Sequence, residues 1–258
     1  MLKARNTTLE RLPWRTASVV ALVAIWWLFS FVVPGHLLPG PAVVGRSVVE
    51  IVGSGEFLHH MAFTVARVGV GFVLAMLLSL SLGISMGIWR VAEKFLEAQI
   101  LIGLTIPALC WSAIAVMLFG LGEAPAVFCV VVIVTPMITV NILAGMKALD
   151  RQLVEMAKVF RADRTLILQE VVFPQLLPYV LAGSRYGLGL AWKVVVIAEM
   201  MGLSSGVGYQ ISYWYGMFSL TKVFAWTLAF SAVMFVIEYA VIRPLESRWT
   251  RWQVRAEV

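Results

Sequence analysis

The sequence predicts an all-α integral membrane protein with six transmembrane helices. Of its 258 residues, 61% are hydrophobic and 13% are charged, whereas soluble domains are about 45–50% apolar and about 25% charged. A soluble globule of this size cannot bury so much apolar surface, which excludes a cytosolic enzyme, a disordered chain and a secreted disulfide scaffold. Six segments are apolar over the roughly 20 residues that a helix needs to cross a bilayer. We place them at about 16–33, 65–88, 98–119, 125–145, 177–201 and 223–242.

The first of these segments is expected to be a retained span. It contains Trp26 and Trp27 and is not followed by a small-residue cleavage site, so it is unlike a removed signal peptide. No segment shows the alternation typical of a membrane β-barrel, so helices are the expected spanning structure. The sequence therefore predicts a single multi-pass transmembrane domain.

The basic residues predict the orientation, because Lys and Arg are retained on the cytoplasmic side of a membrane. Only Arg46 and Lys222 lie on the opposite side, and both chain ends are expected in the cytoplasm. The basic residues are scattered over four short segments and are not interleaved with exposed aromatic residues, which excludes a nucleic-acid partner. Fifteen basic residues fall on the predicted cytoplasmic side: Lys3, Arg5, Arg11, Arg15, Arg90, Lys94, Lys147, Arg151, Lys158, Arg161, Arg164, Arg243, Arg248, Arg251 and Arg255.

The longest predicted cytoplasmic loop, residues 147–175, contains an amphipathic pattern. Leu153, Met156, Ala157 and Phe160 follow the i, i+3, i+4, i+7 spacing of one helix face. So short a helix is not stable in water alone. Its apolar face must therefore pack on the membrane surface, on the ends of the spans or on another protein, and the mixed charges of its other face favour a protein.

Acidic residues and prolines delimit this loop structure. Asp150 suits the positive end of the helix dipole, and Asp163 is placed to cap a second short helix over about residues 164–172. Pro174 and Pro178 then predict a break in the chain before the fifth span.

The segment 153–200, LVEMAKVFRADRTLILQEVVFPQLLPYVLAGSRYGLGLAWKVVVIAEM, resembles the signature of permeases of binding-protein-dependent ABC importers. Three further pieces are similar to the nitrate, sulfonate and taurine branch of that family: LLPGPAVV (37–44), RVGVGFVLAMLLSLSLGISMGI (67–88) and FGLGE (119–123). The resemblance covers about residues 37–245. It implies a type I importer permease fold, with a permease core at about 61–243 and the coupling loop at 147–175.

By this resemblance, the loop helix is a coupling helix that docks on a separate ATPase. In the family's pattern, an E-A-A motif is followed by a glycine, and that glycine position is occupied here by Arg161. A left-handed turn at a non-glycine residue costs roughly 1 kcal/mol, so either the turn differs or an ATPase contact offsets the strain. The residues expected to carry coupling are Glu155, Met156, Ala157, Phe160, Arg161 and Asp163.

The resemblance also implies the partners of the chain. They are a second copy of the permease, two ATPase subunits that bind ATP and Mg, an external substrate-binding protein and the lipid of the bacterial inner membrane. The chain has no G-x-x-x-x-G-K-[ST] motif, and Gly206–Gly208 is followed by no lysine. We therefore expect no nucleotide site, no cofactor and no enzymatic activity in this chain, whose solute is expected to be a small anion.

Ionisable residues inside spans indicate functional sites. Lys193, in the middle of the fifth span, could attract an anionic solute, pair with Glu199 or Glu238, or extend its stem to a membrane interface. Glu199 is better suited to a structural or gating contact than to binding an anionic solute, because its carboxylate repels an anion. Trp111 could narrow the pathway or pack against neighbouring helices. The three candidate pathway residues are Trp111, Lys193 and Glu199.

The remaining polar residues suggest structural roles. Arg67 and Arg185 lie near span ends, where an arginine is expected to extend its charged group to the membrane interface (snorkelling). His59 and His60 are adjacent and lack further ligands, so no metal site is expected. The aromatic stretch 204–220 is equally suited to a binding-protein surface and to the membrane interface.

Two other classes of protein remain as alternatives. A secondary transporter or channel would work without an ATPase, but no convincing inverted repeat relates the two halves of the sequence. A membrane-embedded enzyme would need a ligand cluster or a nucleophile with its base, and neither is present in the pattern.

Overall fold

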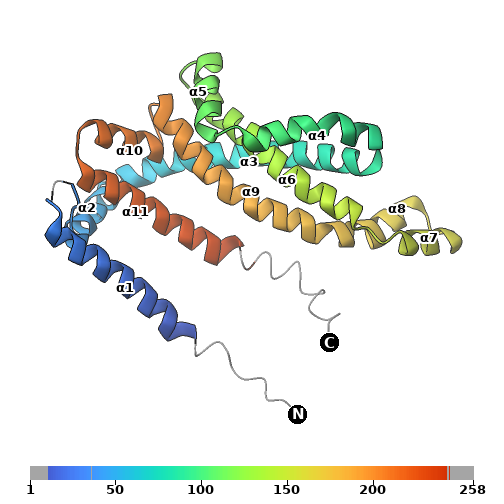
Figure 1. Cartoon of the computed structure of the whole chain (residues 1–258), viewed down its shortest axis with the longest axis horizontal. Helices are drawn as coiled ribbons and strands as arrows, with labels where there is room; N and C mark the ends of the chain where they lie inside the picture. Colours follow the sequence, from blue (N-terminus) through green and yellow to red (C-terminus); the bar gives the residue numbers. More distant parts are fainter. Residues whose placement is uncertain (1–10, 36, 243, 245–258) are drawn as a thin grey trace, which may run out of the picture.

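A computed structural model describes residues 11–35, 37–242 and 244, and this part of the chain is helical throughout with short connections (Figure 1). Several basic residues used to predict orientation, including Lys3, Arg5 and those after position 242, lie outside the described residues. The helices are α1 (Arg11–Val32), α2 (Pro41–Gly53), α3 (Glu56–Ile88), α4 (Arg90–Thr105), α5 (Ala108–Phe119), α6 (Glu123–Lys147), α7 (Arg151–Val159), α8 (Arg164–Ile167), α9 (Phe173–Gly202), α10 (Val207–Gly216) and α11 (Leu220–Ile237), with π-helical turns η1 (Leu168–Val172) and η2 (Glu238–Ile242).

Three long helices, α3, α6 and α9, form the centre of the molecule. Glycines allow their backbones to approach closely, as is common where membrane helices pack. A Cβ at Gly71 would lie 2.7 Å from Val130, and one at Gly187 would lie 2.7 Å from Ile138. Val130 and Ile138 are themselves fully buried on α6. α6 is therefore the central helix, between α3 and α9.

The helices confirm a multi-pass membrane protein but do not by themselves give six straight spans. Four helices are long and apolar enough to cross a bilayer, and a bent pair could supply a fifth crossing. The apolar part of α1, Thr16–Val32, is shorter than these. The four long helices are Glu56–Ile88, Glu123–Lys147, Arg164–Gly202 and Leu220–Ala240.

The third expected span is wrong as a single helix. The chain bends by 100° between α4 and α5. Ile106 is extended (φ −73°, ψ 126°), which is the conformation favoured before a proline, and Pro107 has no N–H with which to continue the α4 ladder. The expected segment 98–119 therefore spans the second half of one helix and all of another.

The expected break before the fifth span is also wrong. Pro174 occupies the first turn of α9, where a missing N–H is tolerated, and the wider π-helical turn η1 precedes it. Pro178 lies inside α9 without ending it. A continuous helical run therefore extends from Arg164 to Gly202, 39 residues long.

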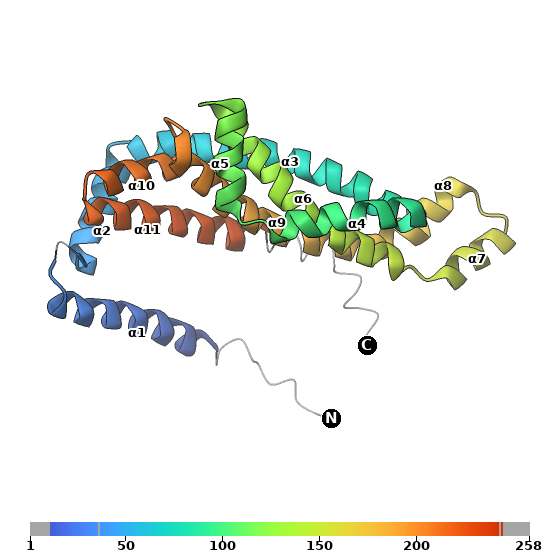
Figure 2. The ribbon, with the colours of Figure 1, turned by 45° about the horizontal axis from the view of Figure 1, so that its top comes forward.

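The first helix, α1, lies along the outside of the bundle (Figure 2). Its described side chains are mostly exposed. Trp26 stacks on Phe224 of α11, with ring centroids 6.0 Å apart. Most of the α1 surface therefore has no contact with the rest of the described chain.

The two ends of the bundle have different structures. α7 and α8 extend from one end, and α10 and α2 lie at the other end (Figures 1 and 2). α10 occupies most of the stretch 204–220 that the sequence left without an assigned structure. The bundle thus holds a protruding hairpin at one end and a short covering helix at the other.

Candidate functional site

The six residues expected to carry coupling lie together at the α7 end. Glu155, Met156 and Ala157 belong to α7, Phe160 is its C-cap, and Arg161 and Asp163 form the turn into α8. α7 buries none of its residues. The side chains of Met156 and Phe160 are 53% and 79% exposed. An apolar face is thus presented to the surroundings on a helix too short to be stable alone.

Hydrogen bonds at its N-terminus stabilise α7. The backbone N–H of Gln152 donates to the Asp150 carboxylate at 2.8 Å, which satisfies one free donor of the first turn. The backbone N–H of Asp150 in turn donates to Oε1 of Gln175, at 2.9 Å, which attaches the start of α7 to α9. α7 is therefore capped at its N-terminus and tied to a long central helix.

The turn after α7 keeps the left-handed geometry at Arg161. Its φ is +56°. The N–H of Arg161 donates to the carbonyl of Lys158 at 2.9 Å, and that of Ala162 donates to Ala157 at 3.0 Å. These two bonds form a Schellman motif, which usually has glycine at the left-handed position. The turn therefore does not differ in geometry, and arginine adopts a conformation that suits glycine.

The following helix begins at Asp163 as the sequence predicted. The N–H of Thr165 donates to Oδ2 of Asp163 at 3.2 Å. This donation lowers the pKa of the Asp163 carboxyl below its usual value. The capped segment is α8 (Arg164–Ile167), which continues without interruption through η1 into α9. A rigid connection thus joins the α7 turn to the centre of the bundle.

At the opposite end, a cluster of polar groups connects α3, α6 and α9. We call Arg67, Glu199, Glu123, Thr64 and Ser205 the Arg67 cluster. Nη1 of Arg67 lies 2.7 Å from Oε1 of Glu199, and Nη2 donates to Oε1 of Glu123 at 2.7 Å and to Oγ of Ser205 at 2.6 Å. Arg67 is 3% exposed and Glu199 is fully buried. The expectation that Arg67 snorkels is therefore wrong.

The same cluster holds the start of α10. The backbone N–H of Val207 donates to Oγ1 of Thr64 at 3.0 Å, and that of Gly208 donates to Oε2 of Glu199 at 2.9 Å. The N–H of Gly206 donates to Nδ1 of His60 at 3.1 Å. Three successive N–H groups at a helix start, which would otherwise lack partners, are thus bound by side chains of α3 and α9.

Two glycines make this approach possible. A Cβ on Gly206 would lie 2.2 Å from the Glu199 carboxylate, and one on Gly208 would lie 2.2 Å from the carbonyl oxygen of Val196. Gly206 also has a φ of +107°, which disfavours other residues. The sequence indicated only that Gly206 and Gly208 do not form a phosphate-binding loop. In the structure, these two glycines form the contact between α10 and α9.

Lys193 has none of the ion-pair partners considered for it. Glu199 bonds to Arg67, and Glu238 pairs with Arg185 at 2.6 Å. Lys193 is exposed on α9 and forms no ion pair with any residue that the structure describes. It lines a cavity of about 390 Å³ between α9 and α11. Its ammonium is therefore available to another group within the span.

Trp111 lies on α5, away from Lys193. Its ring is half-buried and meets Phe128 of α6 edge-to-face, with centroids 6.4 Å apart. The indole N–H is buried and has no hydrogen-bond partner among the described residues. The structure thus does not gather Trp111, Lys193 and Glu199 into one cluster within a single chain.

No metal centre is formed by the described residues. Among residues 11–35, 37–242 and 244, no three His, Cys, Asp or Glu side chains lie close enough to hold an ion. His60 instead stacks on Tyr209 and accepts from Gly206.

Sequence reasoning missed Arg67 and Thr64 as partners of Glu199, and Glu123 and Ser205 as further partners of Arg67. The signal available was that two opposite charges, Arg67 and Glu199, each fall inside an apolar span, and buried charges require pairing. Which charges pair across a bundle depends on helix contacts that the pattern of one chain does not give.

Comparison with known proteins assigns the chain to a class. A family model described as binding-protein-dependent transport system inner membrane component matches residues 68–251. A putative aliphatic sulfonates transport permease protein of Bacillus subtilis is 30% identical over 234 residues, which cover 90% of this chain and 84% of that protein. The taurine transport system permease protein of Escherichia coli is 25% identical over 260 residues, covering 94% of each.

A solved structure has the same fold. A chain of an inward-facing methionine ABC transporter superposes with a TM-score of 0.62 at 18% identity, over 73% of this chain and 93% of that one.

Proposed function

Because the chain belongs to the family of binding-protein-dependent transport system inner membrane components, we propose that it forms the pathway of an ATP-driven importer for a small anion. As a permease subunit of an ABC system, the chain is not itself catalytic. The proposed solutes are aliphatic sulfonates, taurine and nitrate-like anions. Support comes from the sulfonate and taurine relatives and from Lys193, which forms no ion pair with any described residue.

The observation that carries this proposal is the exposed apolar face of α7. Met156 and Phe160 are exposed on a helix that is capped and tied to α9. Exposed apolar anchors on a rigid element are typical of the centre of a protein interface. We take α7 as the coupling helix, with Glu155 and Asp163 at its charged rim and Ala157 and Arg161 completing its surface.

The proposed assembly contains two copies of this permease, two ATPase subunits with ATP and Mg, and a binding protein at the α10 end. Six membrane crossings are proposed, formed by α1, the α4–α5 pair and the four long helices, with both termini in the cytoplasm. The permease core is proposed at about residues 61–243, and the coupling loop at 147–175. This arrangement places the ATPases at α7 and the solute supply at the other side of the inner membrane.

The pathway residues have different proposed roles. Lys193 is proposed to attract the anion, since its ammonium forms no ion pair within the part of the chain that the structure describes. Glu199 is proposed to hold the α10 end of the pathway closed through Arg67, because its carboxylate is fully buried and faces Arg67, Thr64 and Gly208. Trp111 is proposed to narrow the pathway between the two copies.

Reconstituted transport tests the proposal. Permease, ATPase and binding protein from the same system are placed in liposomes, and uptake of labelled ethanesulfonate, taurine, nitrate and lysine is followed with and without ATP. We expect ATP-dependent uptake of at least one of ethanesulfonate, taurine and nitrate, and none of lysine. Uptake of lysine but of no anion would overturn the anionic solute, and equal uptake without nucleotide would show a channel or secondary transporter instead.

A further inference from the structure

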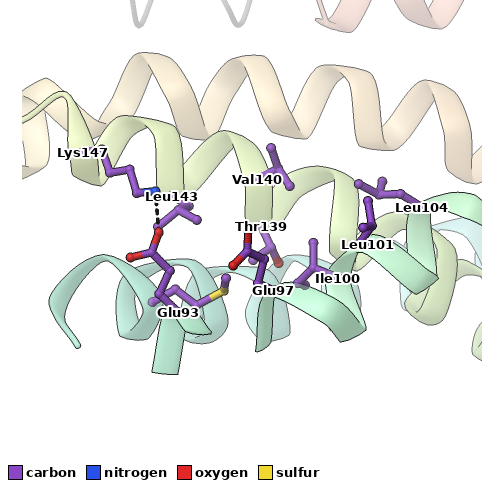
Figure 3. Close-up of a pocket in the computed structure, with 10 residues that line it drawn as sticks. Glu93, Glu97, Ile100, Leu101, Leu104, Thr139, Val140, Leu143 and Lys147 are labelled. Atoms are coloured by element: carbon purple, nitrogen blue, oxygen red, sulfur yellow. Dashed lines mark ion pairs between the residues drawn. The ribbon is translucent and has the colours of Figure 1, made fainter. Parts of the chain in front are cut away.

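A groove of about 240 Å³ runs between α4 and α6, on the surface of the bundle (Figure 3). One end lies beside Lys147, the last residue of α6 before the α7 loop. The groove extends along α4 to Leu104, which is 11 residues beyond Glu93, or about 16 Å at the rise of an α-helix. It thus begins at the α7 end of the bundle and continues into the apolar part of the spans.

The two ends of the groove differ in polarity. Glu93 and Glu97 of α4 and Lys147 and Thr139 of α6 supply polar groups toward the α7 end. The far part is lined by apolar side chains of α4. These apolar residues are Ile100, Leu101 and Leu104, whereas Val140 lies beside Thr139 and Leu143 beside Lys147.

Polar groups in the groove have unused hydrogen-bonding capacity. Lys147 pairs with Glu93 at 2.5 Å, whereas no ion pair or hydrogen bond to Glu97 is present in the described part of the chain. Thr139 is fully buried, and its hydroxyl has no partner among the residues described. Thr139 and Glu97 both line the groove (Figure 3). Glu97 is exposed, so its carboxylate and the buried Thr139 hydroxyl can both accept a hydrogen bond from a ligand that carries a cationic donor.

We propose that this groove binds one phospholipid whose headgroup carries a primary ammonium. The ammonium contacts Glu97 and Thr139, and one acyl chain follows the apolar part toward Leu104. The proposal concerns a lipid site on the outside of the bundle and does not depend on the solute or on ATPase coupling.

Charge and shape select this occupant. The lining has two carboxylates and one ammonium, so an anionic lipid without an amine adds negative charge to a site that already has an excess of it. A choline headgroup has no N–H to donate to Thr139. A free amine would leave the apolar part uncovered, whereas Leu101 and Leu104, 60% and 45% exposed, suit contact with an acyl chain.

Native mass spectrometry of the purified full chain tests the site. The protein is exchanged into mixed micelles with equal amounts of phosphatidylethanolamine, phosphatidylcholine and phosphatidylglycerol that have identical acyl chains. We expect retention of phosphatidylethanolamine about tenfold above the other two, the effect of one charge-assisted hydrogen bond. Glu97→Gln should abolish this preference, while Glu170→Gln, which removes an exposed charge outside the groove, should keep it.

A second variant separates headgroup from groove. Leu101→Trp fills the apolar part and should reduce retention of all three lipids, with the bundle still folded because Leu101 is exposed. Equal retention of the three lipids by the unaltered protein, or an unchanged preference in Glu97→Gln, would overturn the proposal. Efficient disulfide formation between two copies of Leu101→Cys would overturn it as well, since the groove would then be covered by the second copy.

Discussion

The guanidinium of Arg67 lies 2.7 Å from the carboxylate of Glu199, 132 residues further along the chain, and both side chains are buried. The pair joins α3 to α9, and through Glu123 it reaches α6. A buried ion pair adds little stability compared with apolar packing, but loss of one partner leaves a buried charge uncompensated. The Arg67 cluster therefore connects α3, α6 and α9 through charges that each require their partner.

Arg67→Leu should destabilise the protein by about 3–5 kcal/mol, because Glu199 then remains buried without its counter-ion. Unfolding of the purified protein in detergent, followed by circular dichroism, measures this. Lys222→Leu is the matched control, since Lys222 pairs with the exposed Glu50 and exposed pairs contribute about 0–1 kcal/mol. Equal losses of stability in the two variants would contradict the claim that Glu199 requires Arg67 as its counter-ion.

Gly208→Ala should detach α10, because the added Cβ would lie 2.2 Å from a backbone oxygen of α9. We expect a loss of about 1–3 kcal/mol, as for other overpacked sites, and faster proteolysis within α10. Gly216→Ala, at the other end of the same helix, has nothing within 4 Å of the new Cβ and should leave the cleavage rate unchanged. Slow cleavage in both variants would argue against the close α10–α9 contact.

Arg161→Gly should strengthen the turn after α7 by roughly 1 kcal/mol, because glycine adopts a φ of +56° without the steric cost of a side chain. Hydrogen exchange at the Ala162 amide, which donates to Ala157, measures this and should slow. Arg151→Gly is the same substitution at the start of α7 and should speed exchange in that helix, because glycine is a poor helix former. If both variants speed exchange, the left-handed turn is not strained.

Lys193→Gln should raise the KM for anion uptake about tenfold, corresponding to the loss of about 1.4 kcal/mol of attraction, with folding unchanged because Lys193 is exposed. Transport in liposomes over a range of solute concentrations gives the KM. Lys94→Gln removes an exposed cation from α4 and serves as the control. An unchanged KM in Lys193→Gln would remove Lys193 from the pathway.

The sequence predicted those features that depend on local pattern. The helical fold follows from long apolar runs, and α7 follows from the spacing of Leu153, Met156 and Phe160 together with the Asp150 cap. These signals lie within a few residues of each other, so they do not require knowledge of neighbouring helices.

Features that depend on packing between distant helices were not predicted. Arg67 and Glu199 are far apart in the chain, and only the approach of α3 to α9 brings them together. The effect of the prolines on helix ends was predicted wrongly for a related reason. Pro107 ends α4 beside a 100° bend, whereas Pro174 lies in a first helical turn where its missing N–H has no cost.

The central claim is that α7 docks on the ATPase, and co-purification of that subunit with the permease measures it most directly. Phe160→Asp places a charge on an exposed apolar anchor at the end of α7 and should weaken binding about thirtyfold, as for an interface residue contributing about 2 kcal/mol. Met217→Asp, an exposed apolar position at the other end of the bundle, should leave binding unchanged. Retention of the ATPase by Phe160→Asp at the level of the unaltered permease would contradict the account.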